Sequence, residues 1–462
     1  MKRFFLILLG AALTLGARAG NLPALWAERV KSVAAVDYFI ETEAERHLAT
    51  AYGVAIDRQG TIILPSAAVD PRTSPSQLKD FHVYLAGDPT GHPCTYLGQD
   101  SLTGWHFVRT DAATAALLVP VTQWAASGPS PVPALAEHVW GIGLRNKDED
   151  FTPYLLSSQM ALIQSLPQQT GIAQQEVAGP GLPVFNDDGV FLGLAESSFG
   201  QTFLQFSRSD RDGAPIMLID LEESSAFLLA SEVLPNLGRV PGNVFGRPLA
   251  WLGAYGLEAM DRDVANFLKL SDQSGAVVSE VLEGSPAEKM GMKSHDIIIA
   301  IDGKTLPRFR PDHVVTDYVE REIERRRPGD TMTFTVLRGA DRIDLTAKLG
   351  DEPKLAREAE RKYFDHLGLT IREFVYADAI ARRVRTSEAT GVVVSYVKAN
   401  NPAAMSGLEE DDWIKEIDGV PVRSFAEAAS RLGAIAADPA RAEFVLLVSR
   451  GADTTVLRVK LR

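Results

Sequence analysis

The residues from Ala178 to Leu194, AGPGLPVFNDDGVFLGL, are arranged like a loop that presents a nucleophile. A glycine- and proline-rich segment precedes two short apolar runs separated by Asn-Asp-Asp-Gly, a pattern that predicts a loop followed by a β-hairpin. The residue at the apex of this loop is Pro180, which has no reactive side chain and no N–H to donate. The loop is therefore predicted to keep its shape without doing nucleophilic chemistry.

No other group of side chains has the spacing of a catalytic or metal site. The sequence contains no G-x-S-x-G and no H-E-x-x-H motif. His47, His82, His92 and His138 show no metal-ligand spacing and are interpreted as surface or singly hydrogen-bonded histidines. We therefore expect neither a metal nor another cofactor.

The N-terminus has the three parts of an export signal. Lys2 and Arg3 precede an apolar run from Phe4 to Leu15, and Ala17-Arg18-Ala19 forms a small-x-small cleavage site. We expect residues 1–19 to be removed near Ala19 and the product to be periplasmic. An uncleaved membrane anchor is the alternative.

Charge and cysteine content exclude several classes of partner. A net charge of −13 over 462 residues disfavours nucleic acid and anionic membranes as ligands. No later run reaches the roughly 18 apolar residues of a membrane span, so stable membrane insertion is not expected. Cys94 is the single cysteine, which excludes an internal disulfide and predicts a buried thiol.

The first long region, residues 22–235, is rich in short β-type runs separated by turns. This pattern predicts an all-β barrel or sandwich, with a short opening helix around Trp26 to Val36. The runs are YGVAID, GTIIL, FHVYLAG, AALLVPV, HVWGIGL, GVFLGLA and FLQFS.

The second half contains an internal repeat. Residues 275–303 and 391–419 align without a gap at an offset of 116 and are identical at thirteen of twenty-nine positions. Each copy reads as strand, turn, short helix, strand and Asp-Gly turn, followed by a longer helix (residues 313–327 and 424–437) and two strands joined by Arg-Gly-Ala-Asp. Two copies of one α+β domain are predicted, at 245–350 and 362–462, separated by a charged linker at 351–361.

Both copies resemble PDZ domains of the bacterial HtrA type. The resemblance is carried by G-x-x-V-x-x-V, S-P-A-x-x-x-G-L and G-D-x-I-x-x-I-D-G patterns. The two copies depart from the family at His295 and Asp411, which stand where the family has a glycine and where a left-handed turn is expected.

PDZ domains bind an extended peptide as an added strand, with the terminal carboxylate held by a backbone nest after a Leu-Gly pair. By resemblance, the peptide-binding residues are Leu252, Gly253 and Ala254 in the first copy and Leu367, Gly368 and Leu369 in the second. The peptide is expected to lie beside residues 254–257 and 369–373. Both glycines are expected to matter for access of the carboxylate and little for stability.

PDZ pairs of this type follow a trypsin-like serine protease domain, and the first region is similar to one. Gly60 to Val69 resembles the segment that holds the catalytic histidine, Gly104 to Thr110 the segment that opens with the catalytic aspartate, and Ala178 to Val184 the nucleophile loop. Ala67, Gly104 and Pro180 stand where histidine, aspartate and serine would be. None of them can serve in a triad, so the catalytic set is predicted to be empty.

Four residues near these positions could in principle replace the lost groups. They are Ser66, His106, Ser197 and Ser198, and each is ordinary at its place. The resemblance implies a mainly β protein, with a degenerate trypsin-like double β-barrel followed by two PDZ-like α+β domains.

The expected function is that of an exported HtrA-like pseudoprotease. It would bind C-termini of peptides or unfolded envelope proteins as adaptor, chaperone-like holder or regulator of an active HtrA-type protease. A serine endopeptidase with residual or rebuilt activity and a structural assembly subunit are the alternatives. Family members are commonly trimers or larger assemblies, so a homo-oligomer is a further candidate state.

Overall fold

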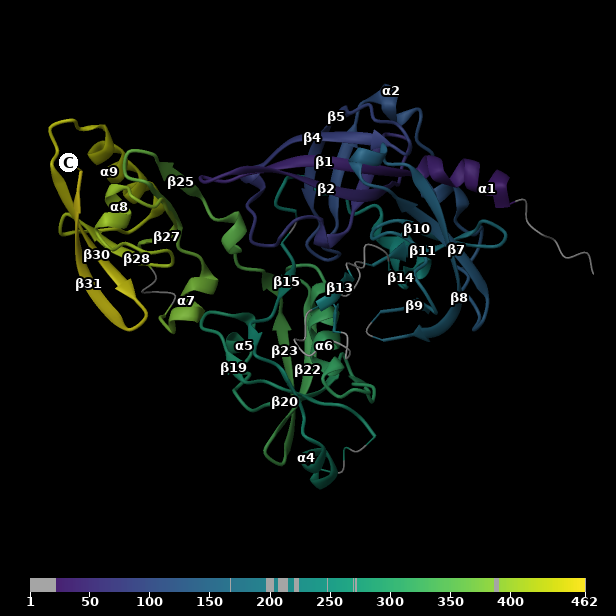
Figure 1. The fold of residues 1–462 in the computed structure, drawn as a ribbon. Coiled ribbons are helices and arrows are strands. Elements are labelled where there is room, and N and C mark those ends of the chain that lie inside the picture. Colours follow the sequence, from purple (N-terminus) through teal and green to yellow (C-terminus); the bar gives the residue numbers. More distant parts are fainter. Residues whose placement is uncertain are drawn as a thin grey trace, which may run out of the picture.

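The computed structural model describes residues 22–166, 168–196, 203–206, 215–219, 224–246, 248–268, 270, 272–385 and 390–461. The predicted signal at residues 1–19 lies outside this range. Within it the chain is mainly β, with two closed barrels followed by two α+β units (Figure 1). No helix in these ranges is both long and apolar enough to cross a membrane.

Two six-stranded antiparallel barrels make up the first region, which confirms the all-β prediction. Barrel closure pairs every strand on both sides and so removes exposed sheet edges. In order around the first barrel the strands are β1 (Val33–Glu41), β2 (Arg46–Ala55), β3 (Thr61–Leu64), β6 (His106–Thr110), β5 (His92–Gln99) and β4 (Leu78–Leu85). The second barrel consists of β10 (Pro183–Asn186), β11 (Phe191–Ala195), β14 (Ala226–Leu229), β9 (Thr170–Ala173), β8 (Pro153–Gln164) and β7 (His138–Leu144).

Three features of the first region differ from or add to the sequence prediction. The run AALLVPV is not a strand, because Asp111 caps the helix α2 (Ala112–Ala115) by accepting from the N–H groups of Ala113 and Thr114, and a 3₁₀ turn follows at Val121–Trp124. The opening helix α1 (Leu22–Arg29) lies earlier than predicted and leads into β1. The short helix α3 (Ala230–Val233) and the strand pair β12 (Phe203–Phe206) and β13 (Pro215–Ile219) complete this region.

The first repeat folds into small sheets around one apolar core. Its helices are α4 (Arg262–Phe267), α5 (Pro286–Lys289) and α6 (Val314–Glu324). Its main sheet contains β17 (Glu258–Ala259), β18 (Ala276–Val277), β20 (Ile297–Ile301), β22 (Thr331–Arg338) and β23 (Asp341–Lys348), with β21 (Lys304–Thr305) beside β20. Two short pairs flank it, β15 (Ala250–Trp251) with β24 (Gly350–Asp351) and β16 (Ala254–Tyr255) with β19 (Glu280–Val281).

The second repeat forms one continuous antiparallel sheet. Its strands in order are β25 (Arg361–Phe364), β26 (Leu369–Glu373), β27 (Val392–Val397), β28 (Trp413–Ile417), β30 (Glu443–Arg450) and β31 (Asp453–Lys460), with β29 (Val420–Pro421) beside β28. The helices α7 (Tyr376–Arg382), α8 (Pro402–Met405) and α9 (Phe425–Ala437) complete it. The helix and strand pair predicted at the end of each copy are confirmed.

The two repeats share a buried ion pair that explains the recurring Arg-Gly-Ala-Asp turn. Arg338 donates to both carboxylate oxygens of Asp296, at 2.8 and 2.7 Å. Arg450 makes the same pair of bonds to Asp412, at 2.7 and 2.7 Å. These aspartates follow His295 and Asp411, whose φ angles of 70° and 68° confirm the expected left-handed turn.

Contacts join the three parts of the molecule. Tyr376 of the second repeat donates to the carbonyl of Glu283, at 3.0 Å, and its ring meets that of Trp251 edge to face. The long hairpin of β1 and β2 reaches the second repeat, where Glu43 accepts from Arg361 at 2.9 Å (Figure 1).

Candidate functional site

The segments that hold Ala67, Gly104 and Pro180 meet between the two barrels. Ala67 lies in the 3₁₀ turn Ser66–Ala68 after β3, and Gly104 lies just before β6. A Cβ atom placed on Gly104 would lie 2.9 Å from the Cβ of Ser66, and one placed on Gly181 would lie 2.7 Å from the Cδ of Pro65. The structure therefore brings Ala67, Gly104 and Pro180 to one region, each on a loop at the end of a strand.

The loop around Pro180 uses its own N–H groups internally. Gly179 donates to the carbonyl of Ile142 at 3.0 Å, Gly181 to that of Ala195 at 2.8 Å, and Leu182 to that of Gly179 at 2.9 Å. Stabilising the oxyanion of an acyl-transfer reaction requires N–H groups aimed into the cleft. The N–H groups of this loop are instead bonded within the second barrel. Leu182 is fully buried in the barrel core.

Ser66 and His106, the two replacement candidates that the structure describes, are close together through the backbone of Ser66, but their side chains are not hydrogen-bonded to each other. Ser66 is exposed at the cleft, whereas His106 is 2% exposed inside the first barrel. The Nδ1 of His106 lies 2.9 Å from the hydroxyl of Tyr96, and burial lowers its pKa to about 4. Ser197 and Ser198 lie outside the described residues. In the described ranges no cluster of histidine, cysteine and acidic side chains could hold a metal ion.

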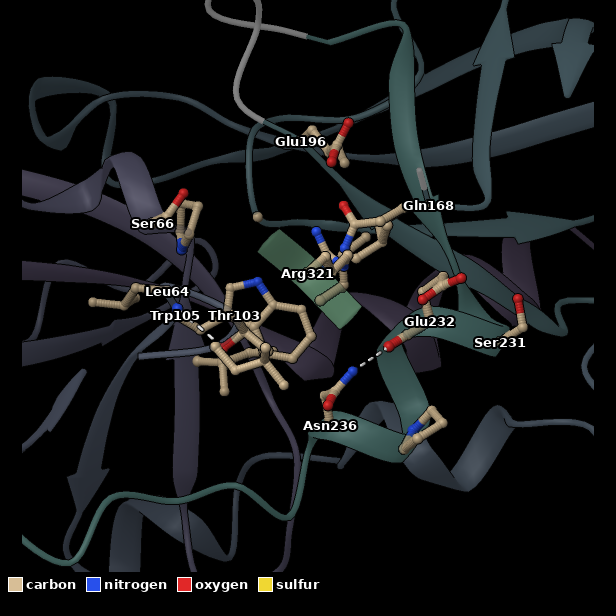
Figure 2. A pocket seen from close by; sticks show the side chains of 18 of the residues that line it. Leu64, Ser66, Thr103, Trp105, Gln168, Glu196, Ser231, Glu232, Asn236 and Arg321 are labelled. Atoms are coloured by element: carbon tan, nitrogen blue, oxygen red, sulfur yellow. Dashed lines mark hydrogen bonds between the residues drawn. The ribbon is translucent and has the colours of Figure 1, made fainter. Parts of the chain in front are cut away.

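A cavity of about 570 Å³ opens beside these positions. Its walls come from Pro65, Ser66, Trp105 and Gly181 of the barrels, from Arg321 of α6 in the first repeat and from Arg325 directly after that helix. Figure 2 shows Ser66 and Trp105 on one side, with Arg321, Gln168 and Glu196 facing them across the cavity. The first repeat thus forms part of the wall of the cleft in which a protease would bind its substrate.

The charged side chains of this cavity come from both domains. Burial lowers the pKa of the Arg321 guanidinium, with Arg325 acting in the same direction, and burial raises the pKa of Glu196. Arg325 lies 3.9 Å from a carboxylate oxygen of Glu232. Arginines and carboxylates therefore face one another in this cavity.

The first groove, between β16 and α6, has an open strand edge. Among the described residues β16 pairs only with β19. The carbonyls of Leu252 and Gly253 accept from Ala287 and Leu282, but their N–H groups donate to no backbone carbonyl in the described part of the chain. Such N–H groups are the donors that a terminal carboxylate needs.

Gly253 and Gly368 are needed for packing, which corrects the expectation that they matter little for stability. Their φ angles are 83° and 65°, in the left-handed region. A Cβ on Gly253 would lie 2.2 Å from the Cβ of Ser285, and one on Gly368 would lie 2.3 Å from the Cβ of Asn401. Substituting either glycine would disturb the helix start packed against it.

The second groove, between β26 and α9, is not open, which corrects the expectation of a free edge at residues 369–373. β25 pairs with one side of β26 and β27 with the other. The N–H groups of Leu367 and Gly368 both donate to the carbonyl of Phe364, at 3.1 and 2.9 Å. The sequence gave no signal for this pairing beyond the apolar Tyr363-Phe364 next to an Asp-His turn.

Comparisons with known proteins match this architecture. Residues 256–349 and residues 366–432 each match the family model of the PDZ domain. The periplasmic pH-dependent serine endoprotease DegQ of Escherichia coli (strain K12) is 30% identical over 183 residues, which are 40% of this chain and 36% of DegQ. A probable periplasmic serine endoprotease DegP-like protein of Pseudomonas fulva (strain 12-X) is 26% identical over 287 residues, 58% of this chain and 53% of that protein.

A solved structure shares the fold. The HtrA-type protease AlgW with tripeptide superposes with a TM-score of 0.50 at 16% identity, covering 72% of this chain and 98% of AlgW. The matches to the two curated relatives span about a third to a half of the length of those proteins. From its two PDZ domains and its matched relatives, the chain is a homologue of the DegP- and DegQ-type serine endoproteases of the HtrA family.

Proposed function

We propose that this chain is a non-catalytic HtrA homologue that captures peptide C-termini or unfolded envelope proteins through its first PDZ groove. The observation that carries the proposal is the loop at Pro180. It has no nucleophile, and the N–H groups of its neighbours are bonded to the carbonyls of Ile142, Gly179 and Ala195. A triad and an oxyanion hole are the two parts on which acyl transfer depends, and this loop supplies neither.

The first PDZ domain supports the binding half of the proposal. Its strand edge at Ala254 and Tyr255 and the N–H groups of Leu252 and Gly253 are available to an incoming strand. Since the matched relatives are periplasmic, we propose the same compartment for this chain, reached through the signal at residues 1–19. The role would be that of an adaptor, a holder of unfolded proteins or a regulator of an active HtrA-type protease.

A digestion assay tests the absence of catalysis. The mature chain is incubated with fluorogenic unfolded casein, with an active HtrA-type protease as the positive control and Ser66→Ala as the matched variant. We expect no turnover above the buffer blank in either form of the chain. Turnover that disappears in Ser66→Ala would instead establish a rebuilt active site around the exposed Ser66.

A peptide library tests the binding half. Random peptides with free C-termini are titrated into the full mature chain, and the tightest binder is compared between parent and Leu257→Asp, which places a charge next to β16. We expect at least a tenfold loss of affinity in Leu257→Asp and none in Val264→Asp, an exposed position on α4. A library without any binder would favour a purely structural subunit.

A further inference from the structure

The two PDZ copies differ at the position where a ligand strand would lie. In the first copy the segment before the Leu-Gly pair, β15, pairs with β24 at the far end of the domain. In the second copy an earlier segment, β25, which ends three residues before the Leu-Gly pair, pairs along the free edge of β26, from Phe364 opposite Leu369 to Arg361 opposite Arg372. The same chain therefore offers one open groove and one filled groove.

We propose that residues 361–364 occupy the second groove as an internal ligand and that Glu43 of the first barrel holds them there. The proposal extends the proposed function, because it confines the capture of outside peptides to the first groove. A peptide that adds as a strand ends at the carboxylate nest. β25 runs in the same direction, since it is antiparallel to β26 and ends at the Leu367-Gly368 turn.

The hydrogen bonds at the nest are those of a bound ligand. The carbonyl oxygen of Phe364 accepts from the N–H groups of both Leu367 and Gly368, at 3.1 and 2.9 Å. Gly368 also donates to the carbonyl of Asp365, at 3.1 Å. An outside carboxylate would need these two donors, so the carbonyl of Phe364 must leave before it can bind.

The side chain of Phe364 fills the groove as a terminal apolar residue would. It is 5% exposed and belongs to the same core as Leu432 of α9. A Cβ on Gly433 would lie 3.9 Å from the ring of Phe364 and 3.8 Å from the Nζ of Lys362. The strand β25 is thus held between β26 and α9, which are the two walls of the groove.

Glu43 fastens the internal ligand from another domain. Its Oε1 accepts from Arg361 on β25 at 2.9 Å and from the hydroxyl of Thr370 on β26 at 2.8 Å. The Glu43 carboxylate is only 13% exposed, so this bridge is partly shielded from solvent. One carboxylate on the β1–β2 hairpin therefore joins the occupant to the strand on which it lies.

Tethering makes this occupant hard to displace. A ligand joined to its groove by a four-residue turn has an effective concentration of the order of millimolar. A free peptide at micromolar concentration would therefore compete poorly in the second groove. Release of Glu43 weakens the hold on β25 and costs the wall formed by β26 only one side-chain hydrogen bond, from Thr370.

The test uses the segment itself as the probe. A fluorescein-labelled peptide with the sequence of residues 357–364, REAERKYF, and a free carboxylate is titrated into the full mature chain and into Phe364→Asp, whose β25 is expected to leave the groove. We expect Phe364→Asp to bind one peptide more per chain than the parent at micromolar concentration. Equal numbers of sites in parent and variant would overturn the proposal.

A second variant covers the case in which Phe364→Asp does not fold. Hydrogen exchange of the amides of residues 362–364 is compared in the parent, in Glu43→Ala and in Glu45→Ala, a control on the same hairpin with an exposed side chain. We expect protection in the parent, at least a tenfold faster exchange in Glu43→Ala, and no change in Glu45→Ala. Unprotected amides in the parent would overturn the proposal that residues 361–364 act as an internal ligand. If Glu43→Ala has no effect, Glu43 does not hold them in place.

The two proposals fail separately. Peptide binding by the parent reports on the first groove and hence on the proposed function. The difference of one site between parent and Phe364→Asp reports on the second groove alone, whether the parent binds or not.

Discussion

His106 is a buried imidazole that ties the stability of the first barrel to pH. It is 2% exposed, and burial lowers its pKa to about 4 from the ordinary value near 6.5. The folded chain keeps this ring neutral, while the unfolded chain protonates it below pH 6.5. Because the unfolded state binds more protons between these two values, the free energy of unfolding falls as pH falls through this window.

We expect this residue to contribute up to about 3 kcal/mol of pH dependence between pH 6.5 and pH 4. The measurement is urea unfolding of the parent and His106→Gln at several pH values across the window. As pH falls, the unfolding free energy of the parent should decrease relative to that of His106→Gln, because glutamine does not titrate. A difference that stays constant with pH would show that His106 is not held neutral in the folded state.

Some residue-level properties could be predicted from the sequence and others could not. The left-handed turns at His295 and Asp411 followed from the repeat pattern and are confirmed by their φ angles. The packing of Gly253 on Ser285 could not be foreseen, because the two residues meet only after the helix α5 folds back onto the Leu-Gly turn. A motif therefore identifies which glycines are special but does not reveal all the contacts that require them.

The paired elements of each repeat are joined by the Arg338–Asp296 and Arg450–Asp412 ion pairs. Asp296 is 1% exposed, and Arg338 joins the end of β22 to the turn before β20. Removing one partner of a buried pair leaves an unpaired charge in the interior, which costs about 3 to 5 kcal/mol in fully buried cases. Because Arg338 itself is 31% exposed, the cost here should be smaller than in those cases.

We therefore expect Arg338→Ala to lower the unfolding free energy of the first repeat, because it leaves the carboxylate of Asp296 buried without its partner. Denaturant unfolding followed by the exchange of first-repeat amides measures this in the full chain. Arg342→Ala, at an exposed position on β23, is the matched control and should be nearly neutral. Equal effects of the two substitutions would mean that the ion pair does not join these elements.

At the level of elements, the internal repeat made the helices and strands of the PDZ copies predictable. The elements that were not predicted correctly depend on tertiary contacts. The offset of 116 fixed the order of helices and strands in both copies, since a repeated pattern is tested twice within one chain. The run AALLVPV failed as a strand because the Asp111 cap favours a helix at that point. β25 was not predicted because a four-residue strand has little sequence signal of its own and is stabilised by its pairing with β26.

Across the whole molecule, the degenerate cleft is enclosed by parts of three units. The loops at Ser66 and Gly181 come from different barrels, and the first PDZ domain contributes Arg321 of α6 and Arg325 directly after it (Figure 2). The second PDZ domain meets the first barrel through Glu43 and the first PDZ domain through Tyr376. The two barrels therefore form a scaffold that positions the two PDZ domains.

This arrangement predicts that replacing the triad residues will not restore proteolysis. The fourfold variant Ala67→His, Gly104→Asp, Pro180→Ser and Leu182→Gly supplies the missing side-chain types. Gly104 has a φ of 71° and a Cβ there would press on Ser66 at 2.9 Å, and Leu182 is a fully buried core residue. Truncating a buried leucine costs about 2 to 5 kcal/mol, so the variant should be markedly less stable than the parent.

The fourfold variant is compared with the double variant Ala67→His and Pro180→Ser, which avoids both the strained and the buried position. We expect neither to digest unfolded casein above the parent, because Pro180→Ser restores one N–H group whereas the N–H group of Ala178, the second donor that an oxyanion hole would use, remains bonded to the carbonyl of Ser224 at 3.5 Å. We also expect the fourfold variant alone to unfold at lower denaturant. Efficient cleavage by the fourfold variant at parental stability would mean that only these four side chains separate this chain from an active protease.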